Sequence, residues 1–127
     1  MKNLAVIATA LAFSLVGCSH NDNVQQLDAT EFNKMISNGQ VQLVDVRTSE
    51  EYAAGHIGYA INIDVQQPDF IQMATARLDK ASPVYIYCRS GRRSATAAKL
   101  LVAQGYTIVN LQGGIEAWQH HKLPLAH

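Results

Sequence analysis

The run Cys88-Arg89-Ser90-Gly91-Arg92-Arg93-Ser94 holds the side chains of this sequence that are best suited to chemistry. It follows Pro83–Tyr87, an apolar stretch rich in β-branched and aromatic residues that predicts a buried strand. From Ser94 onward, small and apolar residues recur at helical spacing until Gly105. A thiol between the end of a strand and the start of a helix lies among outward-facing backbone N–H groups, which bind anions and stabilise a thiolate. The run therefore predicts a cysteine nucleophile, Cys88, that acts on a small anionic substrate.

The rest of the run is expected to bind that substrate. Backbone N–H groups of the whole run, that of Ser90 included, are expected to converge on the sulfur. Gly91 allows the backbone to curl so that these groups face inward. Arg89 and Arg92 add positive potential that steers anions, or are ordinary solvated surface charges. Ser94 either donates its hydroxyl to the sulfur or caps the following helix.

The first residues of the chain have the pattern of an export signal. A short positive start precedes Leu4–Val16, an uncharged segment of thirteen residues, whereas a helix that spans a bilayer needs about 20. The segment ends in Leu15-Val16-Gly17-Cys18, which resembles a bacterial lipobox, whose cysteine becomes the lipid-modified first residue of the mature protein. An ordinary signal peptide cleaved nearby, with Cys18 incidental, is the alternative.

This pattern divides the chain and predicts its location. Residues 1–17 are predicted to be a lipoprotein signal peptide, 18–27 a tether and 28–127 the folded domain. The mature protein is then expected to be exported and to be lipid-anchored at Cys18 in the bacterial cell envelope, on the periplasmic side. Ser19, which follows the cysteine, suggests the outer membrane.

The chain has two cysteines, and lipidation of Cys18 would leave Cys88 as the one free thiol. Exported domains normally pair their cysteines in disulfides, so a lone thiol in an oxidising compartment indicates that it is used. The alternative is a buried, inert cysteine that serves as a small core hydrophobe. The neighbouring arginines disfavour this alternative, because such a loop makes a poor core.

Charge balance and histidine spacing argue against a nucleic-acid site and a metal site. Ten basic and ten acidic residues leave no basic excess, so no nucleic-acid partner is predicted. His120, His121 and His127 lack partners at metal-ligand spacing, so no metal site is predicted.

Helix-capping residues, the spacing of apolar residues and the positions of glycines predict that helices and strands alternate after residue 27. Two capping boxes, Asp28–Glu31 and Thr48–Glu51, begin helices that end at Gly39 and Gly55. The other expected elements are strands over 41–46, 61–63, 84–87 and 107–110, and helices over 68–78, with Pro68 as the first residue, 94–104 and 114–120. This order predicts an α/β fold whose mostly parallel sheet is covered on both faces and binds ligands beyond the carboxyl ends of its strands.

Four segments of the chain carry a resemblance to the rhodanese family. They are Leu43-Val44-Asp45-Val46-Arg47 with Glu50-Glu51-Tyr52, Gly55-His56-Ile57 with Ala60-Ile61-Asn62-Ile63, Tyr85–Ser94, and Leu111-Gln112-Gly113-Gly114-Ile115-Glu116-Ala117-Trp118. They occur in the family's order and span residues 28–124. Where the family often has Pro-Gly after Gly-His-Ile, this chain has Gly58-Tyr59. The resemblance implies a rhodanese-like central five-stranded parallel sheet flanked by helices, with the cysteine in a six-residue loop.

The resemblance also implies a chemistry. A thiosulfate:cyanide-type sulfurtransferase takes the outer sulfur of thiosulfate onto its cysteine as a persulfide, and passes it to cyanide or to a thiol acceptor. Cys88 would be that cysteine, and Arg93, at the end of the loop, would face the anionic donor. No metal or organic cofactor is implied.

Two other functions fit the same loop. One is a small cysteine phosphatase or arsenate reductase on the same fold, but its loop would carry one residue more than the four that separate Cys88 from Arg93. The other is a non-catalytic rhodanese-like binding module. That module is disfavoured because Cys88, Gly91 and Arg93 are all present.

Four further residues of the resembling segments are expected to be structural. Asp45 and Arg47, two residues apart and therefore on one face of a strand, are expected to form hydrogen bonds near the base of the loop. His56 follows a glycine in a turn and is expected to be a hydrogen-bonding residue rather than a base. Trp118 is expected to be a core residue.

Overall fold

The computed structural model describes residues 23–127, in which helices and strands alternate as the sequence predicts. In chain order the elements are β1 (Val24–Leu27), α2 (Ala29–Ile36), β2 (Gln42–Asp45), α3 (Ser49–Ala54), β3 (Ile61–Asn62), α4 (Phe70–Arg77), β4 (Val84–Tyr87), α5 (Arg92–Ala103), β5 (Ile108–Leu111) and α6 (Gly114–His120). The predicted signal peptide, Cys18 and the first part of the predicted tether lie outside the described residues.

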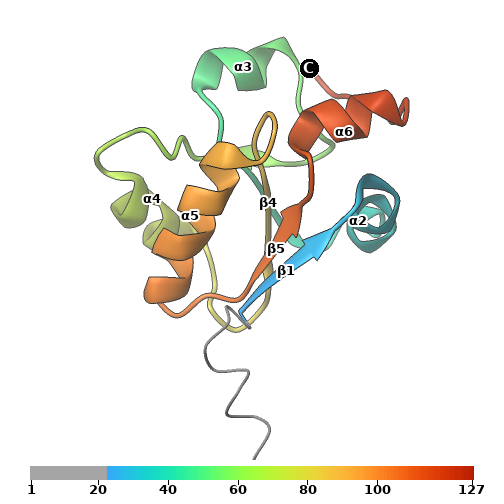
Figure 1. The fold of residues 1–127 in the computed structure, drawn as a ribbon. Coiled ribbons are helices and arrows are strands. Elements are labelled where there is room, and N and C mark those ends of the chain that lie inside the picture. The colour runs from blue at the N-terminus through green and yellow to red at the C-terminus, as the bar shows by residue number, and fades with distance from the viewer. Residues whose placement is uncertain (1–22) are drawn as a thin grey trace, which may run out of the picture.

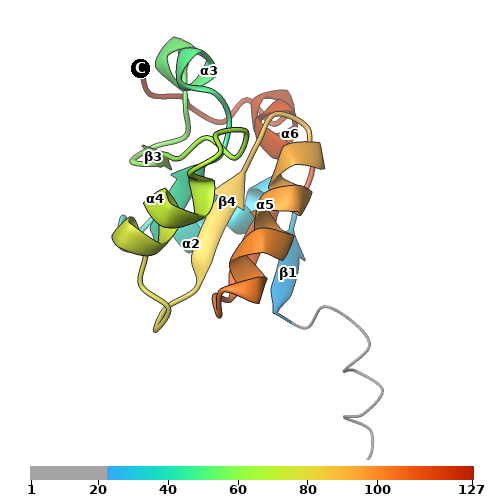
Figure 2. The ribbon, with the colours of Figure 1, turned by 90° about the vertical axis from the view of Figure 1, so that its left-hand side faces the viewer.

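The five strands form one parallel sheet in the order β1-β5-β4-β2-β3. Figures 1 and 2 show α4 and α5 on one face of this sheet, and α2 and α6 on the other. Val44 and Ile86 pack in the core under α4 and α5, whereas Leu43 and Tyr85 pack in the core under α2 and α6. Successive strand residues point to opposite faces, so the central strand β4, which is buried on both sides, consists of the apolar and aromatic residues Val84–Tyr87. The predicted rhodanese-like sheet with helices on both faces is confirmed.

The prediction that residues 18–27 form a tether is wrong for the last four of these residues. Val24–Leu27 form β1, which pairs in parallel with Ile108–Leu111 of β5 at the edge of the sheet. The two central residues of β1, Gln25 and Gln26, are exposed. The strand therefore lacks the apolar run by which the central strands are predicted. The sheet therefore includes residues that the predicted boundary at residue 28 leaves outside the folded domain.

Local hydrogen bonds decide where two of the helices begin. Thr48 and Glu51 form the predicted capping box, in which Thr48 Oγ1 accepts from Glu51 N–H (3.2 Å) and Glu51 Oε1 accepts from Thr48 N–H (3.0 Å). The helix predicted to start at Pro68 starts instead at Phe70. Pro68 lies inside a turn closed by the hydrogen bond from Phe70 N–H to the carbonyl of Gln67 (3.1 Å). The prediction that Pro68 is the first helical residue is wrong.

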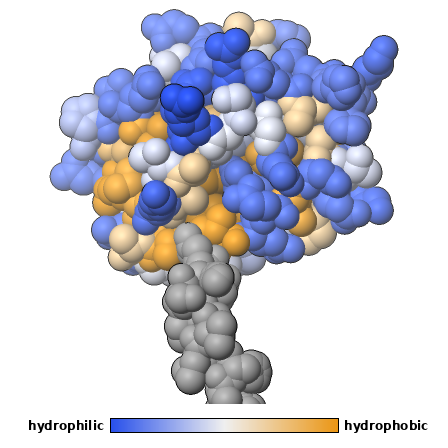
Figure 3. Space-filling model, in the orientation of Figure 1, coloured by the Kyte–Doolittle hydropathy of each residue, from blue (hydrophilic) through white to orange (hydrophobic). Residues whose placement is uncertain are grey.

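The surface differs between the two ends of the sheet. Figure 3 shows a mostly hydrophilic upper end, where the strands finish and α3 lies, and apolar surface lower down beside α4 and α5. Polar surface at the carboxyl ends of parallel strands is where ligands bind in folds of this class. Within the described part of the chain, no helix combines the length and the hydropathy needed to cross a bilayer.

A buried ion pair lies where β2 and β4 end side by side. The fully buried carboxylate of Asp45 accepts hydrogen bonds from Arg47 N–H (2.9 Å), Arg47 Nη2 (2.7 Å) and the hydroxyl of Tyr87 (2.7 Å). Arg47, which is 6% exposed, also donates from Nη2 to the carbonyl of Gly55 (2.7 Å). Burial alone would lower the pKa of Arg47, but the bond to Asp45 and its charge outweigh this and raise the pKa. The predicted structural roles of Asp45 and Arg47 are confirmed.

Replacing Asp45 by asparagine should destabilise the fold strongly. The amide is nearly isosteric with the carboxylate, but it leaves the Arg47 guanidinium buried without a counter-charge. We expect the free energy of unfolding in urea to fall by about 3–5 kcal/mol. Glu31→Gln is the matched control, because Glu31 pairs with Lys34 on the exposed side of α2 (3.5 Å). That change should cost less than about 1 kcal/mol, and equal losses in the two variants would contradict the role of the buried pair.

Candidate active site

Cys88 directly follows β4 at the carboxyl end of the sheet, as predicted. Its Sγ accepts a hydrogen bond from Gly91 N–H (3.0 Å), and its thiol donates to Ser94 Oγ (3.4 Å). Cys88 is a free cysteine with 1% of its surface exposed, so the arginines of the loop do not keep it at the surface. It differs from a cysteine that merely fills the core in that a backbone N–H donates a hydrogen bond to its sulfur.

Gly91 makes this approach of the backbone to the sulfur possible. Its φ of 116° lies in the region that favours glycine. It is the N-cap of α5, which begins at Arg92 rather than at the predicted Ser94. The first N–H groups of a helix have no partner within it, and they give its N-terminus a partial positive charge. Ser94 lies fully buried within this first turn and is not the cap. Its hydroxyl donates to the carbonyl of Gly91 (3.3 Å) and accepts from the Cys88 thiol, so neither of its two predicted roles is observed.

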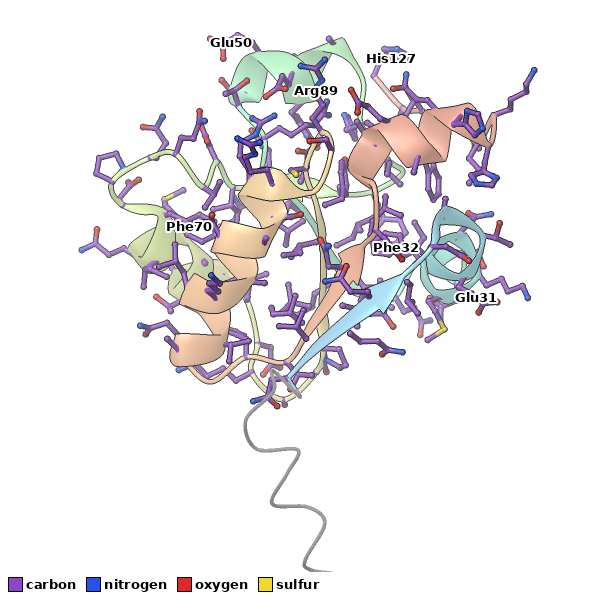
Figure 4. All side chains as sticks on the ribbon, viewed as in Figure 1. Glu31, Phe32, Glu50, Phe70, Arg89 and His127 are labelled. Atoms are coloured by element: carbon purple, nitrogen blue, oxygen red, sulfur yellow. The ribbon has the colours of Figure 1, made fainter. Side chains whose placement is uncertain are left out.

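The three arginines of the loop have different surroundings. Arg93 forms a two-fold ion pair with Glu51 of α3, from Nη1 to Oε1 (2.7 Å) and from Nη2 to Oε2 (3.0 Å). Arg89 pairs through Nε with Glu116 of α6 (3.0 Å), but both side chains are more than half exposed. Arg92 is exposed and has no ion pair within the part of the chain that the structure describes. Figure 4 shows Arg89 on the loop between α3 and α6.

The pair between Arg93 and Glu51 keeps both groups charged. The Arg93 guanidinium lowers the pKa of Glu51 to about 2, against the cost of its partial burial. Glu51 in turn raises the pKa of Arg93. The sequence predicts Glu51 only as part of a capping box, because 42 positions separate it from Arg93 and no local pattern links the two. The fold adds Glu51 to the surroundings of the loop.

The N-terminus of α6 supports the loop from behind. Ile115 N–H donates to the carbonyl of Cys88 (2.9 Å), and Glu116 N–H donates to that of Arg89 (3.1 Å). Gly114 lies against these carbonyls with a φ of 65°. A Cβ at this position would overlap the backbone of Arg89 and come within 2.7 Å of the Cys88 carbonyl oxygen. Gly114 was not a predicted site residue, although two adjacent glycines before an apolar helix are a visible signal of close backbone approach.

Two residues expected to be structural have that role here. His56 Nδ1 lies 3.1 Å from the carbonyl oxygen of Tyr52, and its ring stacks on the Tyr52 ring with 3.9 Å between centroids. Trp118 is buried and donates from Nε1 to the carbonyl of Pro124 (2.8 Å). Over residues 23–127, no three side chains of His, Cys, Asp or Glu gather into a group that could hold a metal ion.

Comparison with known proteins agrees with this geometry. Residues 28–121 match the family of the Rhodanese-like domain. The chain belongs to this family. Its active-site loop is the connection from β4 to α5, which carries the predicted nucleophile Cys88.

Three relatives of this rhodanese-like domain are similar to it over nearly their whole length. A protein of Allochromatium vinosum named sulfurtransferase is 38% identical over 104 residues, which cover 80% of this chain and 94% of the relative. Thiosulfate sulfurtransferase 18 of Arabidopsis thaliana is 31% identical over 124 residues, covering 88% and 90%. The crystal structure of a rhodanese-like domain protein from Staphylococcus aureus is 38% identical with a TM-score of 0.65, and the match covers 74% of this chain and 90% of that one.

Replacing Gly114 by alanine should disrupt the active-site loop of this rhodanese-like domain. The new Cβ would overlap the Arg89 carbonyl, so α6 must move away from the loop. A left-handed backbone alone costs an L-residue about 1–2 kcal/mol, and we expect a larger loss of stability in thermal unfolding. Gly39→Ala is the control, because Gly39 has a φ of 77° with nothing within 4 Å of the new Cβ. Equal losses would contradict the close packing of α6 against the loop.

Proposed function

We propose that this rhodanese-like domain is a thiosulfate:cyanide-type sulfurtransferase that carries the transferred sulfur as a persulfide on Cys88. The observation that carries the proposal is the Gly91 N–H that donates to Cys88 Sγ (3.0 Å) at the positive end of α5. A donor at this place stabilises the thiolate, which is the nucleophilic form of cysteine. The names of the two similar relatives, sulfurtransferase and thiosulfate sulfurtransferase 18, support the same chemistry.

In the first half-reaction, the Cys88 thiolate attacks the outer sulfur of thiosulfate. A new S–S bond forms on Cys88 while the S–S bond of thiosulfate breaks, and the electron pair of that bond leaves with sulfite. The N–H groups of residues 89–94, with Arg93, bind the oxygens of the donor and stabilise the charge that grows on the leaving group. The product is the Cys88 persulfide.

In the second half-reaction, cyanide or an acceptor thiolate attacks the terminal sulfur of the persulfide. The S–S bond breaks, and its electron pair returns to Cys88 as a thiolate. The product is thiocyanate, or a persulfide on the acceptor thiol. Both halves use the same sulfur in turn, so the kinetics should be ping-pong. Neither half-reaction needs an external oxidant or reductant.

The loop length favours sulfur transfer over phosphoryl transfer. Four residues separate Cys88 from Arg93, one fewer than in the loop expected of a cysteine phosphatase. A phosphoryl group needs donors for three equatorial oxygens around a tetrahedral centre. A shorter loop that closes on one sulfur atom leaves less room for that centre, and a misplacement of about 1 Å can cost on the order of a hundredfold in rate.

Replacing Cys88 by serine should abolish sulfur transfer and leave thermal stability nearly unchanged. Serine is nearly isosteric with cysteine but cannot form a persulfide. We expect thiocyanate production from thiosulfate and cyanide to disappear in the variant. Mass spectrometry after thiosulfate treatment should find one added sulfur on Cys88 in the wild type and none in the variant. A substantial residual rate in Cys88→Ser would refute the assignment.

Assays of both reactions on one preparation of the wild-type protein distinguish sulfur transfer from phosphate hydrolysis. The protein should hydrolyse aryl phosphates negligibly while it transfers sulfur from thiosulfate. Faster hydrolysis of aryl phosphates than transfer of sulfur would favour the phosphatase function instead.

We also propose that the domain is exported and attached to the cell envelope through a lipid on Cys18. The arrangement of the sheet is compatible with such an anchor. The chain enters β1 at the amino end of the parallel sheet, whereas Cys88 follows β4 at the carboxyl end. Figure 1 shows these two points at opposite ends of the domain. An anchor before β1 would therefore leave the catalytic loop facing away from the membrane, open to small anions.

Cys18→Ala should abolish membrane attachment without reducing sulfur transfer by the released domain. Residues 19–23 separate Cys18 from β1, and five residues span at most about 18 Å. The domain should therefore stay close to the bilayer in the wild type. Detergent partitioning and the mass of the mature N-terminus provide the measurement. A mature wild-type protein without an acylated Cys18 would refute the anchor.

A further inference from the structure

The ion pair between Arg93 and Glu51 joins the catalytic loop to a helix that carries none of the predicted site residues. Glu51 Oε1 accepts from Arg93 Nη1 (2.7 Å) and from the N–H of Thr48 (3.0 Å), and Oε2 accepts from Arg93 Nη2 (3.0 Å). The pair is partly shielded from water, with 22% of the Arg93 side chain and 30% of the Glu51 side chain exposed. One carboxylate therefore both caps α3 and orients the guanidinium.

The geometry of the pair leaves one edge of the Arg93 guanidinium free. A guanidinium has five N–H donors in a planar fork. Glu51 occupies the end of the fork, with one N–H from each terminal nitrogen. Within the described residues, Arg93 Nε makes no hydrogen bond, so the edge formed by Nε and one terminal nitrogen keeps two parallel donors. Such an edge binds two oxygens of an oxyanion at once.

We propose that Glu51 is a positioning residue in the half-reaction with the sulfur donor. By holding Arg93, Glu51 presents the free edge of the guanidinium to two oxygens of the anionic donor. The inference rests on the proposed sulfurtransferase function. Thiosulfate carries three such oxygens, and they leave together as sulfite when the outer sulfur is transferred. An arginine whose orientation is already fixed loses less side-chain freedom when it binds them.

Glu51 is itself held from both ends of α3. At the N-terminal end, Thr48 and Glu51 form the reciprocal capping box. At the C-terminal end, the carbonyl of Gly55 accepts from the buried Arg47 guanidinium (2.7 Å). The position of the Glu51 carboxylate therefore depends on the buried ion pair at the end of β2. No comparable support holds Glu116, whose pair with Arg89 is exposed.

The test compares the two half-reactions in Glu51→Gln. The glutamine amide places an N–H₂ group where a carboxylate oxygen stood, so it cannot accept from both terminal nitrogens of Arg93. We expect kcat/KM for thiosulfate to fall by about tenfold to a hundredfold, chiefly through a higher KM. The rate at which cyanide discharges the preformed persulfide should be unchanged, because cyanide has no oxygens for Arg93 to bind.

Two control variants separate positioning from stability. Glu50→Gln changes the neighbouring carboxylate, which points away from the loop (Figure 4) and contacts Ser49 rather than an arginine. It should leave both half-reactions unchanged. Asp28→Ala removes the N-cap of α2, whose carboxylate accepts from Glu31 N–H (2.9 Å) and contacts neither Glu51 nor Arg93. It should lower the Tm while leaving KM for thiosulfate unchanged.

The possible outcomes distinguish this inference from the proposed function. Wild type without sulfur transfer would overturn the function itself. If wild type transfers sulfur, an unchanged kcat/KM for thiosulfate in Glu51→Gln would overturn the positioning role alone. Equal slowing of both half-reactions, with a Tm lowered as in Asp28→Ala, would also overturn it. If Glu51→Gln does not fold, Glu51→Asp provides the same measurement, because aspartate keeps the charge but its carboxylate is one methylene too short to hold both terminal nitrogens of Arg93. A donor-specific loss would support the role, and an unchanged KM would overturn it.

Discussion

A charged carboxylate buried at the end of β2 constrains the whole active-site end of this domain. Asp45 is removed from water completely, so every hydrogen bond that its oxygens lose on folding must be replaced by the protein. Arg47 and the hydroxyl of Tyr87 supply the replacements. Burial and the nearby Asp45 raise the pKa of Tyr87, which therefore stays protonated and able to donate. The ends of β2 and β4 are thereby fixed against each other, one residue before Cys88.

The consequences of this constraint extend to the catalytic loop by a chain of direct contacts. Arg47 holds the carbonyl of Gly55, where α3 ends. The hydroxyl of Tyr87 accepts from the N–H of Ile57, which fixes the turn after α3. The opposite end of α3 carries the carboxylate that orients Arg93. A buried ion pair contributes little net stability by itself, because desolvation offsets its attraction. The pair is better explained by its geometric role, because it fixes the ends of β2 and β4 and the carbonyl at the end of α3.

The N-termini of α5 and α6 contact the loop around Cys88 from two sides and have different roles. The N-terminus of α5 directs the Gly91 N–H at the sulfur. The N-terminus of α6 donates instead to the carbonyls of Cys88 and Arg89, and so holds the backbone of the loop from behind. Only glycine at position 114 lets α6 come this close. The Gly91 N–H thus faces the sulfur, while the carbonyls of Cys88 and Arg89 are bound by α6.

The amino-acid sequence by itself predicted Cys88 as a nucleophile, and it determined the place of this residue between a strand and a helix, the central strands and the α3 capping box. These features depend on residues within one or two turns of each other, so periodicity, caps and glycines reveal them. Only the tertiary structure decided that Val24–Leu27 form an edge strand, that Glu51 binds Arg93 and that Gly114 supports the loop. Each of these depends on which strands lie side by side. The order of a parallel sheet is set by packing of distant segments, which no local pattern encodes.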